Sequence, residues 1–364
     1  MESVNLLQFL NIYEELSAPN FATCELGLFN FFDLFGDEPQ FTQEINLGVF
    51  YVSQKTLDRC IVIDGINRII SLSLLLHAVC ECYKKTTPKN EKAIKIIRSK
   101  YLLNGDKTKL KLPDKYQSIY NKIIFGERLS GKEKESPLFK LLHELWTQIK
   151  TNELNAANIF TLLQKVYIYV VNSSGVNIRD LYYSLNNKNK ELNHILLIDS
   201  FMEEQELLSD WNIFKQIFDN KTADILLFFK DFFITKFNND NDTSDRLYME
   251  FSNYFMTMLM YVNKNVIMSK LVRSANVYND ILNVNLSNPK LKKLLVQIKM
   301  HNGEDTYAYL LNIYEDYLDG NLTEETLVEI LLTIDEYLKN RLKTPNNVSF
   351  NELIKYLNAF ITCK

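Results

Sequence analysis

The sequence predicts an α+β protein that is predominantly helical. Only 10 Gly and 7 Pro occur in 364 residues, too few for a loop-rich or all-β chain. Three short runs of β-branched and aromatic residues, at 47–52, 60–63 and 167–171, are typical of strands. Nearly all the rest, above all the chain after residue 171, consists of long stretches rich in Leu, Ile, Asn, Lys and Glu, which favour helices.

The elements follow in a simple order. Residues 1–16 carry apolar side chains at helical spacing and predict an N-terminal helix, which Ser-Ala-Pro-Asn at 17–20 ends. The runs at 47–52 and 60–63, joined by a polar turn, predict a β-hairpin, and a long buried helix then extends to about residue 83. A Lys-rich helix is expected at 91–101, and Pro113 marks the start of another. After the third strand we expect helices at 178–185, 196–208, 211–218, 223–237, 246–263, 265–282, 289–300, 306–318 and 323–342.

Composition limits the class of protein. The length suggests about two domains, and 46% hydrophobic residues are ample for a core. The net charge of −4 gives no overall attraction to nucleic acid, so any DNA contact would need a local basic patch. Residues 1–16 lack a signal-peptide pattern, and no apolar segment is long enough to span a membrane. We therefore expect a cytoplasmic protein with no membrane partner.

Cysteine and histidine give no metal-binding pattern. The five Cys are too irregularly spaced for a disulfide framework, and Cys80 and Cys82, two residues apart on a helix, point to different faces. His77 lies in an apolar helix and is expected in the core rather than at a metal. The sequence has no P-loop, Gly-rich dinucleotide turn, Ser elbow or HExxH segment. No metal site and no standard hydrolase or metalloenzyme is expected.

The most informative segment is the turn at Asp64-Gly65. A wholly apolar strand ends there, and a helix is expected to begin around Asn67-Arg68. The unpaired N–H groups and the positive end of a helix attract anions, and Gly65 allows a ligand to approach the backbone closely. Asp64 and Arg68 would then place one charge of each sign at the turn. The alternative interpretation is an ordinary Asp-Gly turn in which Asp64 caps the helix.

Several segments, in their order along the chain, resemble one protein family. Asp64-Gly65-x-x-Arg68, preceded by Leu-Gly-Val-Phe at 47–50, is similar to the Asp-Gly-Gln-Gln-Arg signature of ParB/sulfiredoxin-like, GmrSD-type restriction proteins, usually labelled a domain of unknown function. Leu110-x-Leu-x-Asp, residues 185–192 (LNNKNKEL), Ala275-x-x-Tyr and the helix at 334–341 are similar to further family segments. The resemblance covers nearly the whole chain.

The resemblance implies a fold and a function. The fold would be a ParB/sulfiredoxin-like α/β domain at 1–200 with a helical insertion at about 86–160, followed by a helical domain at 201–364. The family is linked to phage defence, and its signature turn lies in a nucleotide-hydrolysis site that controls a DNA-cleaving HNH nuclease. Asp64 and Arg68 would then be catalytic, while Gly65, Asn67, Asn186 and Lys188 would bind the nucleotide. The chain itself leaves the cofactor open; the resemblance implies a nucleoside triphosphate with Mg²⁺.

The chain departs from the family pattern at the signature itself. Ile66 and Asn67 replace its two Gln, and an apolar Ile66 cannot orient water or phosphate by hydrogen bonding. Ala22 and Thr23 stand where the family has Gln and Arg, and Thr cannot replace the bidentate phosphate contact of Arg. The pattern therefore favours a regulatory component of a DNA restriction or defence system that binds a nucleotide or nucleic acid with weakened or lost hydrolysis.

Two alternatives stay open. One is an active nucleoside triphosphate hydrolase that controls a partner nuclease, because this chain has no HNH-type His/Asn cluster and would need a separate HNH subunit. The other is a non-catalytic structural or interaction protein, in which Asp64 and Arg68 form an ion pair that fixes the turn. DNA is a further candidate partner, and the basic residues that could contact it are Lys84, Lys85, Lys89, Lys92, Lys95, Arg98 and Lys100. A run of this kind is also typical of a solvated helix face.

Overall fold

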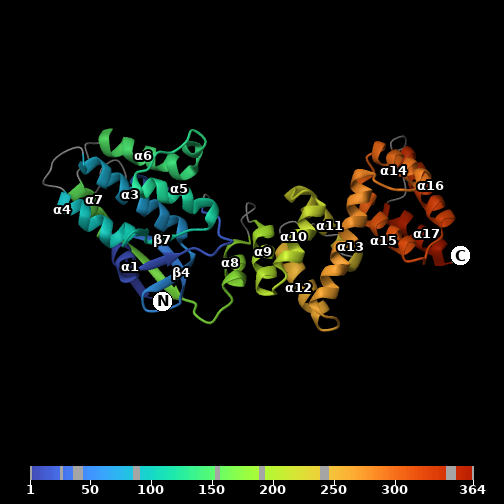
Figure 1. Ribbon diagram of the computed structural model, residues 1–364, viewed down its shortest axis with the longest axis horizontal. Helices are drawn as coiled ribbons and strands as arrows, with labels where there is room; N and C mark the ends of the chain where they lie inside the picture. The colour runs from blue at the N-terminus through green and yellow to red at the C-terminus, as the bar shows by residue number, and fades with distance from the viewer. Residues whose placement is uncertain are drawn as a thin grey trace. The chain divides into compact units, whose positions relative to one another are not determined.

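The computed structural model describes residues 2–24, 28–35, 44–84, 91–151, 156–187, 193–237, 246–341 and 350–362. They form two compact units, Met1–Asn193 and His194–Lys364 (Figure 1). The fold is α+β and predominantly helical, as the sequence predicts. All strands of the described residues belong to the first unit, and the second unit is built of helices. No described helix has the length and apolar character needed to cross a membrane.

A mixed six-stranded sheet organises the first unit. Its strands are β1 (Glu2–Asn5), β2 (Glu15–Ser17), β3 (Ile45–Gln54), β4 (Arg59–Asp64), β7 (Leu110–Lys111) and β8 (Val166–Asn172), in the spatial order β1-β8-β3-β4-β2-β7. β3 and β4 form the predicted antiparallel hairpin, and β3 pairs in parallel with β8. β2 lies between β4 and β7, parallel to both. β8 contains the third predicted strand.

The predicted N-terminal helix is wrong at both ends. Residues Glu2–Asn5 form a strand that pairs with β8, and Glu15–Ser17 form the strand between β4 and β7. Only α1 (Leu6–Ile12) is helical, and the side chain of Asn5 caps it by accepting from the backbone N–H of Leu7 and Gln8. The partners of these strands lie more than 40 residues away in the chain, so local periodicity carried no sign of the pairing.

Helices cover the sheet and fill the rest of the unit. They are α2 (Phe32–Phe35), α3 (Ile66–Lys84), α4 (Glu91–Ile97), α5 (Asp114–Phe125), α6 (Pro137–Thr151), α7 (Ala156–Leu163) and α8 (Ile178–Asn186). α3 is apolar on all sides because it is buried on all sides; it packs against α6, and α6 packs against α5 (Figure 1). The helix predicted at 91–101 is α-helical only in α4 and continues as a π-helix, Arg98–Leu102. A two-stranded hairpin, β5 (Leu103–Asn104) and β6 (Lys107–Thr108), follows it.

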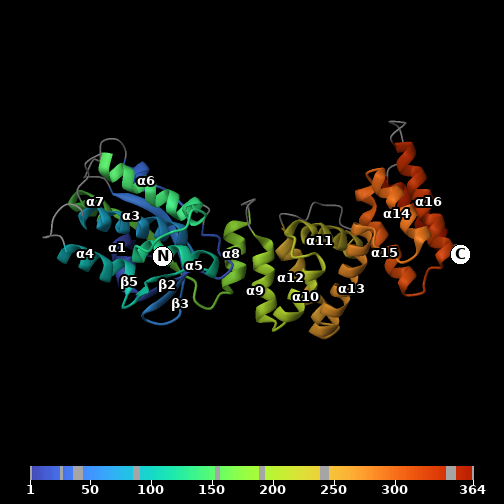
Figure 2. The ribbon, with the colours of Figure 1, turned by 45° about the horizontal axis from the view of Figure 1, so that its top comes forward.

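The second unit contains the eight helices predicted from residue 196 to residue 342 and a further helix, α17, that was not predicted. They are α9 (His194–Glu204), α10 (Leu208–Ile217), α11 (Thr222–Phe237), α12 (Leu247–Leu259), α13 (Lys264–Asn283), α14 (Pro289–Met300), α15 (Tyr307–Leu318), α16 (Glu324–Arg341) and α17 (Phe350–Thr362) (Figure 2). α13 packs against α10, α11, α12 and α15, and so lies at the centre of the unit.

Aromatic side chains form much of the core of the helical unit. Trp211 stacks on Phe214 with ring centroids 4.7 Å apart, and Phe229 and Phe251 contact the same indole. These four residues are fully buried. Aromatic pairs of this kind add to the stability already gained from burial of their area.

Candidate functional site

The Asp64–Gly65 turn joins β4 directly to α3. Asp64 is the last residue of β4 and α3 begins at Ile66, so Gly65 alone makes the connection. Its φ is +107°, a conformation that other residues rarely adopt. A Cβ at this position would lie 2.7 Å from Cγ of the Phe50 ring. Glycine is therefore required both by the backbone conformation and by the close approach of the turn to Phe50.

The turn lies at an edge where three parallel strands end. β4, β2 and β7 run in the same direction, so Asp64, Ser17 and Lys111 end neighbouring strands at one edge of the sheet. Ligands of open α/β sheets bind outside the carboxyl ends of parallel strands. The turn therefore occupies the edge at which such a sheet would hold a ligand.

Arg68 binds a bulge in the neighbouring strand. The register of β3 against β8 shifts between Asn46 and Val49, which places Leu47 and Gly48 in a β-bulge. The guanidinium of Arg68 donates to the carbonyl of Leu47 at 2.5 Å and to that of Val49 at 2.9 Å. A bulge leaves backbone groups without ladder partners, and Arg68 supplies donors to them.

The same guanidinium forms an ion pair with Asp64. Its Nη2 lies 2.9 Å from Oδ2 of Asp64, four residues earlier in the chain. It also lies over the ring of Phe50, with the guanidinium carbon 4.4 Å from the centroid. Burial lowers the pKa of Arg68, and the charge of Asp64 opposes that effect. The sequence-predicted pair is thus brought together, with Arg68 turned toward the sheet.

Asp64 keeps one carboxylate oxygen for other contacts. Its Oδ2 accepts from Arg68, whereas Oδ1 has no hydrogen bond among the described residues. The side chain is 37% exposed, against 23% for that of Arg68. Asp64 is therefore the more accessible of the two charges.

Asn67 connects the turn to a segment that follows β2. Its Nδ2 donates to the carbonyl of Thr23 at 3.3 Å. The backbone N–H of Thr23 in turn donates to the phenol oxygen of Tyr182 on α8, also at 3.3 Å. No local pattern could have pointed to Tyr182, because its link to the turn runs through a backbone group 159 residues away.

Asn186 lies in α8, the helix that also contains Tyr182 and that is linked to the turn through Thr23 and Asn67. Its Nδ2 donates to the carbonyl of Tyr182, one turn earlier in α8, and α8 packs against β4. The structure gives Asn186 no hydrogen bond to Asp64, Gly65 or Arg68. Lys188, the other residue predicted from that segment, lies outside the described residues.

Metal-binding groups do not gather in the described part of the chain. No group of three or more His, Cys, Asp and Glu side chains there has the arrangement to hold a metal ion. Cys24, Cys60 and Cys80 are buried, and Cys82 is half-buried. His77 is buried, as expected of a core residue. At the Asp64–Gly65 turn itself, Asp64 supplies a carboxylate, the type of group that can bind a cation carried by a ligand.

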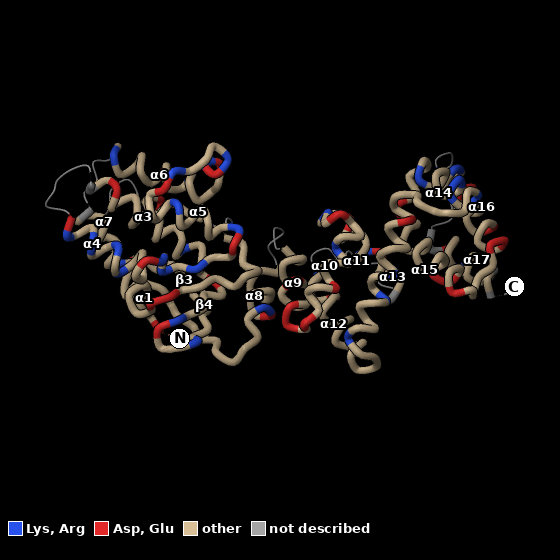
Figure 3. Tube along the Cα trace, in the orientation of Figure 1, with Lys and Arg blue, Asp and Glu red and all other residues tan. Residues whose placement is uncertain are grey.

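The basic residues after α3 are only partly described. Lys85, Lys89 and the side chain of Lys84 lie outside the described residues. Lys92, Lys95 and Lys100 are exposed, and Arg98 is half-buried. Figure 3 shows Lys and Arg positions around α4.

Comparison with known proteins adds no relative. No protein-family model matches the chain, and no curated protein matches it. What the residues and their geometry define is therefore an α+β chain with a strand-turn-helix site in its sheet-containing unit.

Proposed function

We propose that the chain is a divergent GmrSD-type, ParB-like protein that binds a nucleotide at the Asp64–Gly65 turn and has weakened or lost the ability to hydrolyse it. In this proposal it is a cytoplasmic regulatory component of a DNA restriction or phage-defence system. A ParB/sulfiredoxin-like architecture for the first unit is part of the proposal, as is a separate HNH nuclease as partner.

One observation carries the proposal. The Asp64–Gly65 turn is a direct strand-to-helix connection at the edge where β4, β2 and β7 all end. The first N–H groups of α3 follow it, and such groups bind phosphate oxygens. Gly65, with its positive φ, lets the chain pass directly from β4 into α3, so these N–H groups follow the strand end at once.

The side chains around the turn support binding without turnover. Ile66 is buried and apolar, the amide of Asn67 donates to Thr23, and the guanidinium of Arg68 is held by Leu47, Val49 and Asp64. Rate enhancement of phosphoryl transfer depends on donors positioned at the developing charge. Here those side chains are bonded within the protein, so we expect slow hydrolysis or none.

One side chain of this site, the carboxylate of Asp64, is of the type that binds a magnesium ion carried by a nucleotide. Mg²⁺ is commonly held by one or two carboxylates together with substrate phosphates, and the partly exposed carboxylate of Asp64 matches that donor type. When bound, the ion would neutralise phosphate charge, while Asp64 would hold it at the turn.

A second candidate function is favoured by a different observation. The three acceptors that Arg68 satisfies are all within the protein, which is what a purely structural role for the Asp64–Arg68 pair requires. In that case the turn would be a fixed part of the scaffold of a structural or interaction protein. The remaining alternative is an active hydrolase that controls a partner nuclease. It requires the guanidinium of Arg68 to release these three acceptors when a nucleotide binds, so that it can contact the phosphate.

Thermal unfolding of the full chain with ATP, GTP and CTP, each with Mg²⁺, tests the proposal. We expect at least one of them to raise the melting temperature in a saturable way, because a ligand at 100 times its Kd stabilises by about 2.7 kcal/mol. Asp64→Asn should weaken that nucleotide's binding roughly tenfold or more, the loss of a charge-assisted contact. Glu325→Gln, at an exposed carboxylate of α16, is the control for the loss of one carboxylate and should bind as the wild type does.

Phosphate release separates the three functions. Binding without release supports the proposal. Release that Asp64→Ala and Arg68→Ala both abolish would establish the active hydrolase instead. If no nucleotide changes the melting temperature and Arg68→Ala only lowers it, the pair is structural.

A further inference from the structure

A pocket of about 710 Å³ lies beside the π-helical turn of the first unit. It is lined by Glu91, Ile94, Lys95, Arg98, Ser99, Leu103, Asn104 and Gly105. This volume is within the range of roughly 300–1,000 Å³ that is typical of ligand sites. None of the residues at the Asp64–Gly65 turn lines it.

One helix face and one hairpin form the pocket. Glu91, Ile94, Lys95, Arg98 and Ser99 are spaced by three and four residues, so they lie on one side of α4 and of the π-helix that continues it. The opposite wall comes from β5 and the turn after it.

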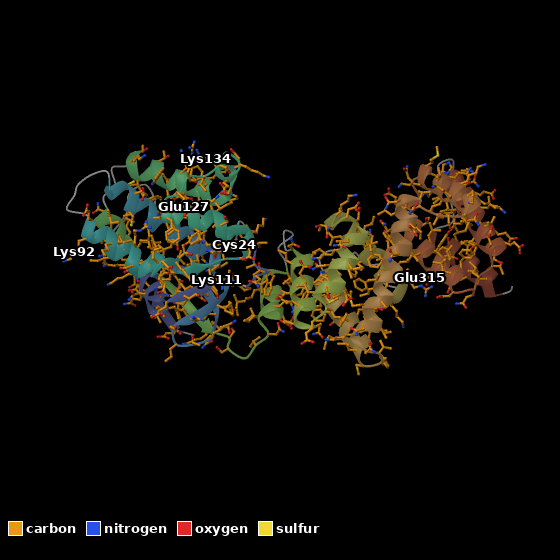
Figure 4. All side chains as sticks on the ribbon, viewed as in Figure 1. Cys24, Lys92, Lys111, Glu127, Lys134 and Glu315 are labelled. Atoms are coloured by element: carbon orange, nitrogen blue, oxygen red, sulfur yellow. The ribbon has the colours of Figure 1, made fainter. Side chains whose placement is uncertain are left out.

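The surroundings of the pocket are basic, although the chain as a whole has a net charge of −4. Between Glu91 and Lys107 there are five Lys and Arg but only two Asp and Glu. Lys92 lies on α4, three residues before Lys95, and Lys107 pairs with the pocket residue Asn104 across the β5–β6 hairpin. Figure 4 labels Lys92, near the start of this segment. The positive charge therefore extends beyond the pocket itself.

Two hydrogen bonds hold the basic wall in place. Nη2 of Arg98 donates to the carbonyl of Ile124 at 2.8 Å, which fixes the guanidinium and leaves other N–H groups for a ligand. The amine of Lys109, a buried side chain, donates to the carbonyl of Lys100 at 2.9 Å and so supports the π-helical turn from the other side. A cation positioned in advance loses less entropy when it binds an anion.

We propose that this pocket binds one nucleotide of a single-stranded nucleic acid, with the flanking phosphates on Lys92, Lys95 and Arg98. Cations that continue past the pocket fit a polyanion better than a single small anion. Ile94 and Leu103 give the pocket an apolar part suited to a base, whereas the bases of a duplex are stacked and cannot enter. With aliphatic rather than aromatic contacts, little sequence preference is expected. The site goes beyond the nucleotide site at Asp64 and does not depend on it.

Binding of fluorescent 20-nucleotide DNA and RNA strands to the full chain at a series of salt concentrations tests this proposal. Lys92→Gln/Lys95→Gln should weaken binding about tenfold at 0.1 M salt. It should also reduce the slope of log K against log salt by about 1.4, the value for two phosphate contacts on a single strand. Lys292→Gln/Lys293→Gln, which removes the same charge from exposed positions of α14, should leave both quantities unchanged.

Further variants and ligands in the same experiment distinguish this site from the nucleotide site at Asp64 and from nonspecific binding of polyanions. Arg98→Lys keeps the charge and should still lose affinity, because the fork is lost; unfolding curves check that each variant is folded. Asp64→Asn should bind the strands as the wild type does, so failure of the nucleotide proposal leaves this result intact. Four results would each overturn the proposal. Two concern specificity: equal affinity for a duplex of the same sequence, and displacement of the strand by polyglutamate at equal charge concentration. The other two are unchanged affinity of the Lys92→Gln/Lys95→Gln variant and no binding of the strands at low salt.

Discussion

The guanidinium of Arg68 lies 4.4 Å from the centre of the Phe50 ring, and the same ring blocks the space that a side chain at residue 65 would need. Phe50 thus contacts both the turn and the cation that anchors it. Because Arg68 also binds two carbonyls at the bulge of β3, one side chain fixes the end of β4, the start of α3 and the bulge. The turn is therefore held in place by contacts within the protein.

Arg68→Ala should lower the stability of the first unit by about 2 kcal/mol. The variant leaves the carbonyls of Leu47 and Val49 without their donor and Asp64 without its cation, and partly buried groups of this kind cost about 1–3 kcal/mol when unsatisfied. The pair is partly exposed, which limits the loss. Urea unfolding followed by Trp146 fluorescence in a Trp211→Phe background reports the first unit alone, because each unit has one Trp.

Arg59→Ala is the matched control for this change. Arg59 begins the same strand and is exposed, so its truncation should alter stability by less than about 0.5 kcal/mol. Arg68→Lys should fall between the two, since the amine keeps the charge but cannot reach both carbonyls. Equal stability of Arg68→Ala and Arg59→Ala would show that the bonds at the bulge contribute nothing measurable.

Gly65→Ala should destabilise the first unit by about 2–6 kcal/mol. A positive φ costs a non-Gly residue about 1–3 kcal/mol, and overpacking adds about 1–3 kcal/mol where the new Cβ meets Phe50. The same Trp146 fluorescence assay measures the change.

A glycine elsewhere in the first unit separates the two contributions to that loss. Gly175 has φ +91°, closest to that of Gly65 among glycines with nothing within 4 Å of the would-be Cβ, so Gly175→Ala measures the cost of a positive φ without overpacking. The excess loss of Gly65→Ala over Gly175→Ala should shrink when Phe50 is replaced by Leu. A loss for Gly65→Ala no larger than for Gly175→Ala would mean that the turn moves away from Phe50 without cost.

The sequence predicted the parts of the fold whose signals are local. The hairpin of β3 and β4, strand β8 and the long buried helix α3 were recognisable because apolar runs bounded by turn residues reflect burial directly. Strands β1 and β2 were missed because three or four residues carry no periodicity of their own. They become strands by pairing with β8, β4 and β7, which lie far along the chain.

The candidate site was predictable to a similar degree. The Asp64–Gly65 turn and the Asp64–Arg68 pair could be predicted because the two opposite charges stand on either side of a strand-to-helix turn that is itself marked by Asp-Gly. That Arg68 points toward β3 could not be foreseen, because it depends on a bulge that frees two carbonyls there. The link from Asn67 through Thr23 to Tyr182 depends on tertiary contacts and left no local pattern.

Val284→Gly should stabilise the helical unit by about 1 kcal/mol. Val284 ends α13 with φ 53° and ψ 42°, a left-handed conformation that costs a residue with a Cβ about 1–2 kcal/mol. Glycine adopts it freely, and its larger unfolded-state entropy offsets only part of the gain.

Trp211 fluorescence in a Trp146→Phe background follows the unfolding of the Val284→Gly variant. Asn302→Gly is the control, because Asn302 has a similar φ of 54° but tolerates it, and little change is expected. A Val284→Gly variant less stable than the wild type would contradict the strain.

Asp231 should make the helical unit less stable as the pH rises from about 4 to about 6. Its side chain is buried and accepts a 2.5 Å hydrogen bond from the hydroxyl of Tyr278. Burial raises the pKa of Asp231 from 3.8 to about 6, against the opposing effects of that bond and of Lys230. With the folded-state pKa above the unfolded one, the folded protein holds the extra proton. The stabilisation is therefore complete below the unfolded pKa and is lost as the pH passes the folded one. A shift of about two units corresponds to up to about 3 kcal/mol.

Asp231→Asn isolates this contribution, because Asn cannot ionise and still offers Tyr278 an acceptor. Unfolding free energies from Trp211 fluorescence at pH 4 to 7, again in the Trp146→Phe background, should show the wild type losing stability relative to Asp231→Asn across that range. Glu325→Gln, at an exposed position of α16, controls for the loss of one carboxylate and should follow the wild type at every pH. Parallel curves for the wild type and Asp231→Asn would mean that Asp231 is ionised in the folded state throughout, with its charge compensated within the core.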